Sequence, residues 1–277
     1  LDVHAPDHHL DFSKMGTPPT PPFRSLQTFS MANRAPTTVC GCYGWQPLMN
    51  HLTTFVFFFA PSTDSSLPEV ATQLAAYRRT LKTVCLRAGY GSSFWVVPEV
   101  ELHPFLRQLD LEVYDARDPN VELASLSMES AQTVLEDILR DPEGAKSLRT
   151  LNLPRWSTTG LSAPMPITGL RRIATQLPDL HRLSISADSA IFEDFSPTEL
   201  SQATSELRYL HLDDTRNSWS SSFGPRDYRR IAQFLDACFP NLVAVTVSTD
   251  PMRQDGLAEH WELIEHLRQL YQALRTR

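Results

Sequence analysis

The sequence has little cysteine and no long hydrophobic run. Its longest apolar stretch, Phe55 to Ala60, spans six residues, whereas a membrane-spanning helix needs about 20. Four cysteines in 277 residues are too few for the disulfide framework of a small secreted domain. These absences argue against a membrane protein and against a disulfide-stapled extracellular protein.

Positive charge is also in short supply. Lysine and arginine together number 25, against 32 aspartates and glutamates, which gives a formal net charge of −7. A protein that binds the phosphate backbone of nucleic acids normally carries a basic excess. We therefore expect no nucleic-acid partner.

The chain shows no sign of a secretory route. None of its six asparagines begins an Asn-x-Ser/Thr glycosylation site, and no charged-then-apolar leader opens the sequence. We expect an intracellular protein, cytoplasmic or nuclear. Residue 1 is leucine rather than methionine, which indicates that upstream sequence is missing.

Signatures of catalysis and of metal binding are absent as well. The sequence has no Gly-x-Ser-x-Gly, no His-Glu-x-x-His, no phosphate-binding glycine loop and no dinucleotide fingerprint. Cys40 and Cys42 lie near His51, but a structural zinc site needs four ligands, usually as two close pairs. Cys85 and Cys238 stand alone. We expect no enzyme, no catalytic residues, no metal and no cofactor.

What the sequence does contain is a repeat of the form Leu-x-x-φ-x-φ, where φ is Leu, Ile, Val, Met or Phe. The pattern begins at Leu26, Leu52, Leu81, Leu106, Leu148, Leu180, Leu207 and Leu242, and one further match at Leu123, only 17 residues after Leu106, is attributed to chance or to packing within the longest unit. The steps are 26, 29, 25, 42, 32, 27 and 35 residues, and composition alone would give only about three matches. Leu1-Asp2-Val3 fits the last half of the pattern, so we expect the chain to begin inside a repeat.

Strands and helices alternate along this repeat. Each match predicts a short strand, because its φ residues fall on one face. Helices are predicted over 67–77, 129–140, 168–177, 197–204, 225–238 and 257–275. This alternation favours a parallel sheet with helices outside it.

The last of these helices, 257–275, has an apolar stripe of its own. The stripe consists of Leu257, Trp261, Ile264, Leu267, Tyr271 and Leu274. We expect this helix to cover the open end of the stack, because a repeat array needs a capping unit with one polar face.

Leu-x-x-Leu-x-Leu strands joined by helical segments resemble leucine-rich repeats of the ribonuclease-inhibitor-like kind. The resemblance covers nearly the whole chain. It implies an α/β solenoid, a horseshoe with the parallel sheet on its concave side and the helices on its convex side. It also implies a single domain over residues 1–277, with 257–275 as the C-terminal capping helix.

Two segments resemble more specifically the repeats of fungal F-box proteins: Leu177-Pro178-Asp179-Leu180-His181-Arg182-Leu183 and Phe239-Pro240-Asn241-Leu242. In that family the repeat domain is the substrate receptor of an SCF ubiquitin ligase. The resemblance implies the same role here, with the SCF adaptor bound only through a missing N-terminal F-box. The alternatives are an intracellular leucine-rich-repeat scaffold unrelated to ubiquitin ligation and, more distantly, an enzyme with an unrecognised site.

A candidate partner site follows from strand geometry. Residues between the φ positions face the concave surface, since strand side chains alternate. Arg182, Tyr209, His211 and Asp213 fall on adjacent strands there, and the following loops carry Trp156 and Trp219. Tyr, Trp and Arg are enriched in binding hot spots, so these six residues predict a site for a protein or peptide. The alternative is that neighbouring loops satisfy them.

A second place on the same surface is apolar. Val56 and Phe58 are predicted to be exposed there, where they need either a cover from another segment or a partner.

Overall fold

The computed structural model describes residues 2–4, 27–33, 53–59, 82–89, 106–114, 135–136, 138–153, 165–190, 205–216, 224–248 and 256–275. They belong to two compact units, Leu1–Leu148 and Arg149–Arg277, each of which is described by itself. The single domain expected over residues 1–277 stays a prediction.

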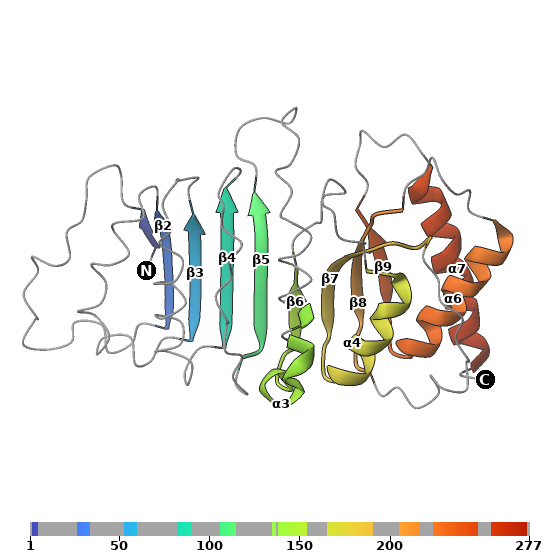
Figure 1. The fold of residues 1–277 in the computed structure, drawn as a ribbon, viewed down its shortest axis with the longest axis horizontal. Coiled ribbons are helices and arrows are strands. Elements are labelled where there is room, and N and C mark those ends of the chain that lie inside the picture. The colour runs from blue at the N-terminus through green and yellow to red at the C-terminus, as the bar shows by residue number, and fades with distance from the viewer. Residues whose placement is uncertain are drawn as a thin grey trace, which may run out of the picture. The chain divides into compact units, whose positions relative to one another are not determined.

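Unit 1 is built on five parallel strands that pair in chain order (Figure 1). They are β1 Asp2–His4, β2 Thr28–Asn33, β3 Thr54–Phe59, β4 Thr83–Gly89 and β5 Gln108–Tyr114. Thr28, Thr54, Thr83 and Gln108 lie in register, as the repeat predicts. The unit also contains a short helix, α3 Pro142–Ala145.

Unit 2 contains a four-stranded parallel sheet and most of the described helices. Its strands are β6 Thr150–Asn152, β7 Arg182–Ala187, β8 Tyr209–Asp214 and β9 Ala244–Val247, in that order. Its helices are α4 Leu170–Gln176, α6 Pro225–Cys238 and α7 Leu257–Arg275, and the 3-10 helix η4 Ile167–Gly169 precedes α4. The fold class is therefore α/β with a parallel sheet and helices.

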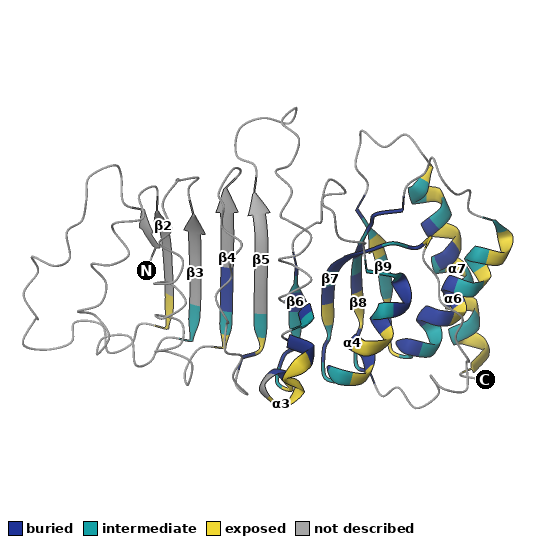
Figure 2. Ribbon diagram, in the orientation of Figure 1, coloured by how far each residue is buried: buried dark blue, intermediate teal, exposed yellow. Residues whose placement is uncertain are grey.

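The core of unit 2 forms because its strands bury alternate residues. Leu183 and Ile185 of β7 are each 1% exposed, and Leu210 of β8 is equally buried. The helices contribute Ile231 of α6 and Ile264 of α7, which are also buried, and Figure 2 shows the buried positions of both helices in dark blue. The leucine repeat therefore sets the register of the strands, since a shift by one residue would expose every core side chain.

Three of the six predicted helices agree with the structure in their bounds to within one residue. Helices α6 and α7 have the predicted ends, and η4 with α4 covers 167–176 against the predicted 168–177. Pro142 follows the helix predicted over 129–140 and opens the short helix α3, because proline at a first helical position sacrifices no hydrogen bond. The helices predicted over 67–77 and 197–204 lie outside the described residues.

The predicted apolar stripe of α7 is wrong at its last residue, Leu274, while Leu267 and Tyr271 are half-buried. Trp261 and Ile264 are buried as expected, but Leu274 is 67% exposed. Arg268 is instead the buried residue there, at 0% exposure. The helix meets backbone carbonyls at this point rather than side chains, so a cation with five donors fits where leucine would not.

One backbone arrangement recurs along both units. The carbonyl oxygen just before a strand accepts two successive N–H groups from the start of the next strand. In unit 1 these oxygens belong to Gln27, Thr53 and Lys82, and in unit 2 to Arg149, His181 and Arg208. The sequence repeat thus has a counterpart in the hydrogen bonds of the main chain.

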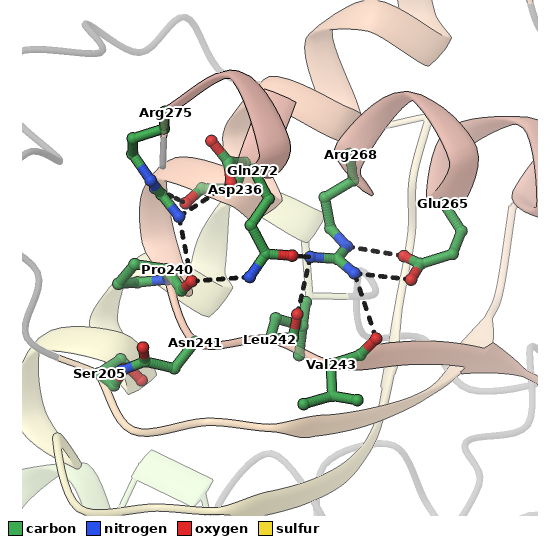
Figure 3. Close-up of polar contacts among 10 residues, drawn as sticks. All are labelled: Ser205, Asp236, Pro240, Asn241, Leu242, Val243, Glu265, Arg268, Gln272 and Arg275. Carbon is green, nitrogen blue, oxygen red and sulfur yellow. Dashed lines mark hydrogen bonds and ion pairs between the residues drawn. The ribbon is translucent and has the colours of Figure 1, made fainter. Parts of the chain in front are cut away.

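At β9 the side chains of α7 take the place of those N–H donors (Figure 3). The Val243 oxygen, next in the series, accepts from Arg268 Nη2 at 3.4 Å. Pro178 O accepts from the N–H of Glu206 at 2.7 Å, whereas the matching Pro240 O accepts from Gln272 Nε2 and Arg275 Nη2, both at 3.0 Å.

Candidate functional site

Two of the predicted site residues form an exposed pair on unit 2. Arg182 begins β7 and Tyr209 begins β8, and the two are register partners. The Arg182 guanidinium carbon lies 4.9 Å from the centroid of the Tyr209 ring, which is a cation–π contact. Arg182 is exposed and Tyr209 is 44% exposed. The pair therefore presents both a cation and an aromatic surface to solvent.

His211 and Asp213 continue the same side of β8, since alternate residues share a face. His211 Nδ1 lies 3.0 Å from Thr246 Oγ1 of β9. Ser186 Oγ of β7 donates to Asp213 Oδ2 at 3.2 Å. Both residues are half-buried. We call Arg182, Tyr209, His211 and Asp213 the open face.

The structure thus brings four of the six predicted residues onto one face. The other two, Trp156 and Trp219, lie outside the described residues. Val56 and Phe58 belong to β3, paired with Cys85 and Arg87 of β4, but their side chains lie outside the described part of the chain.

Sequence reasoning missed a row of basic residues beside the open face. Arg149, His181 and Arg208 immediately precede β6, β7 and β8, and their carbonyl oxygens belong to the recurring series. Arg149 forms an ion pair with Asp179 at 2.9 Å, and His181 Nδ1 lies 2.8 Å from the Asp179 carbonyl oxygen. Arg208 is exposed. The sequence could have revealed this row, because each of its residues immediately precedes a predicted strand. We call Arg149, His181 and Arg208 the basic rim.

The sequence pattern also did not single out Asp214, a buried residue that holds parts of the fold together. It is 1% exposed and accepts hydrogen bonds from the backbone N–H groups of Ser189 and Arg216. Its Oδ2 accepts from Ser189 Oγ at 2.6 Å and from Trp261 Nε1 at 2.8 Å. This carboxylate ties together the segment after β7, the end of β8 and helix α7.

The described residues contain no group of three or more His, Cys, Asp and Glu side chains that could hold a metal ion. Cys85 and Cys238 are buried free thiols. Burial raises the pKa of Cys238 to about 12, although Arg171 acts in the opposite direction. This thiol is therefore protonated and unreactive at neutral pH. Cys40, Cys42 and His51 lie outside the described residues.

None of the helices in the described part of the chain is both long enough and apolar enough to cross a membrane.

Comparisons of the chain with protein-family models, with curated proteins and with solved structures find no match.

Proposed function

We propose that the chain is a protein-binding leucine-rich-repeat solenoid that holds a protein or peptide on its open face. The observation that carries this proposal is the exposed Arg182–Tyr209 pair. Its aromatic ring and guanidinium are the groups most enriched in binding hot spots. The recurring register and the buried leucines support the solenoid, and the contacts of Arg268 support α7 as its C-terminal cap.

The resemblance to fungal F-box repeats extends the proposal to ubiquitin ligation. In that role the chain is the intracellular substrate-recognition part of an SCF ligase, with the adaptor bound by an F-box outside it. An intracellular scaffold unrelated to ligation is the alternative, and it uses the same face. The proposed work of the chain is binding rather than catalysis, without metal or cofactor.

Affinity capture from cell extract, followed by titration of the purified partner, tests the binding site. Tyr209→Ala removes the ring on which Arg182 rests and is expected to weaken binding by more than about 1 kcal/mol. Leu270→Ala on α7 removes a side chain that is 60% exposed elsewhere and serves as the matched control. Equal affinities of wild type and a folded Tyr209→Ala variant would remove the open face as the site.

A second experiment separates ligation from scaffolding. Residues 1–277 alone are expected not to bind the SCF adaptor, and the same chain with its natural upstream segment is expected to bind it. An upstream segment that confers no adaptor binding leaves the scaffold as the better function. Tight adaptor binding by residues 1–277 alone would show that the docking element lies within this chain.

A further inference from the structure

The starts of β7 and β8 gather positive charge in a protein whose net charge is −7. Arg182 lies on the open face, and the basic rim next to it adds two further arginines, Arg149 and Arg208. Among the described residues, the nearby carboxylates neutralise only part of this positive charge. Asp179 is engaged by Arg149 at 2.9 Å, and neither Arg182 nor Arg208 has a carboxylate partner within the described part of the chain.

Both arginines are neighbours of one aromatic residue, Tyr209, across the sheet or along the chain. Arg182 rests on the Tyr209 ring at 4.9 Å, and adjacent parallel strands are about 4.8 Å apart. Arg208 is the chain neighbour of Tyr209, and both side chains are exposed. The starts of β7 and β8 therefore carry two exposed arginines beside one exposed aromatic ring.

From this arrangement we propose that the partner segment is acidic. It is a peptide whose carboxylates bind Arg182 and Arg208 while an apolar side chain packs on Tyr209. Guanidinium groups bind carboxylates in a planar, two-pronged geometry, and stacking on Tyr209 fixes the plane of Arg182 in advance. This inference rests on the proposed function and names the chemistry of the partner that the open face takes.

The charges around the open face suit a short acidic peptide better than a nucleic acid. Charges farther away than about 8 Å are screened at physiological ionic strength, so the overall charge of −7 does not cancel the local cations. A nucleic acid gains affinity from many successive phosphate contacts. The two arginines without carboxylate partners are too few for that, and Asp213 at the far end of the open face opposes a polyanion.

Fluorescence anisotropy with three labelled peptides tests the proposal. One carries glutamates on both sides of a central leucine, and the others replace every glutamate with glutamine or with lysine. The glutamate peptide is expected to bind most tightly and to weaken as salt is added. Arg182→Gln and Arg208→Gln are each expected to weaken it at least about fivefold, in line with the strength of a charge-assisted hydrogen bond.

Arg226→Gln is the matched control, because Arg226 is exposed on α6 and its loss changes the net charge equally. Equal binding of the glutamate and glutamine peptides, no binding of the glutamate peptide, or an equal effect of Arg226→Gln overturns the proposal. Tighter binding of a single-stranded oligonucleotide overturns it in favour of a phosphate site. If any of these occurs while Tyr209→Ala still abolishes capture of a protein partner, the proposed function stands and only the acidic chemistry falls.

Discussion

At the scale of single residues, the carboxylate of Asp214 links three segments of unit 2. Four donors reach it, from Ser189 twice, from Arg216 and from Trp261. A buried donor left without an acceptor costs about 1–3 kcal/mol. The stability of unit 2 therefore depends on this side chain more than on the open-face aspartate beside it.

Asp214→Ala is accordingly expected to destabilise the fold by about 2–4 kcal/mol, because several buried donors lose their acceptor together. Urea unfolding measures the change. Asp213→Ala is the control, since Asp213 is the next residue and is half-buried, and its effect is expected to be clearly smaller. Equal losses for the two variants would contradict the role assigned to Asp214.

Asp236, near the end of α6, has a carboxyl group whose pKa differs from its ordinary value. Burial raises the pKa of this carboxyl, while Arg275 and Arg268 act to lower it. Its Oδ1 lies 3.2 Å from Arg275 Nη2 but without the alignment of a hydrogen bond. The desolvated charge is therefore incompletely compensated.

The raised pKa predicts an unusual dependence of stability on pH. The folded chain holds the Asp236 proton more tightly than the unfolded chain does, so acidification favours the folded state. This contribution is complete below the unfolded pKa and is lost as pH rises through the folded pKa. Urea unfolding at several pH values is expected to show wild type gaining stability relative to Asp236→Asn as pH falls through this interval. A relative loss of stability would mean that the attraction of Arg275 outweighs burial.

At the scale of elements, α7 closes the edge of β9 with side chains. The Arg268 guanidinium donates twice to Glu265, at 2.7 Å each, and to the Leu242 oxygen at 2.9 Å. A strand that paired with β9 in the register of the others would need the Val243 oxygen, which Arg268 also engages. The helix thus blocks an edge that would otherwise be open to pairing.

Arg268→Leu is expected to cost about 3–5 kcal/mol, because it leaves the Glu265 carboxylate partly buried without its partner. It is also expected to promote association through the exposed edge, which sedimentation measures. Arg275→Leu is the comparison variant on the same helix and is expected to cost less, since the Arg275 side chain is 41% exposed whereas Arg268 is fully buried. An Arg268→Leu variant as stable and as monomeric as Arg275→Leu would refute the edge-closing role.

The contrast between leucine and charged positions explains what the sequence could predict. Leu183 and Leu210 defined the strands and their register because burial permits only one alternation. Arg268 was not among the residues predicted to be buried, because its partners, the Leu242 and Val243 oxygens, carry no signal in a side-chain pattern. Asp214 was overlooked for a similar reason, since Ser189 and Trp261 are distant in sequence. The Arg182–Tyr209 contact was predictable because it follows directly from register.

At the scale of the whole molecule, each unit repeats one strand register and one carbonyl arrangement. This regularity aligns residues that are 27 positions apart, such as Arg182 and Tyr209, into a surface that no local motif encodes. Function in such a protein belongs to columns across the repeats rather than to a stretch of sequence. The central claim is that the Arg182–Tyr209 column binds a partner.

A double-mutant cycle on partner affinity tests that claim most directly. The dissociation constant is measured for wild type, Arg182→Ala, Tyr209→Ala and the double variant, with folding checked by circular dichroism. Because Arg182 rests on the Tyr209 ring, the account predicts that each single change costs more than about 1 kcal/mol. It also predicts that the double change costs less than their sum. A folded double variant that binds the partner as tightly as wild type would contradict the account.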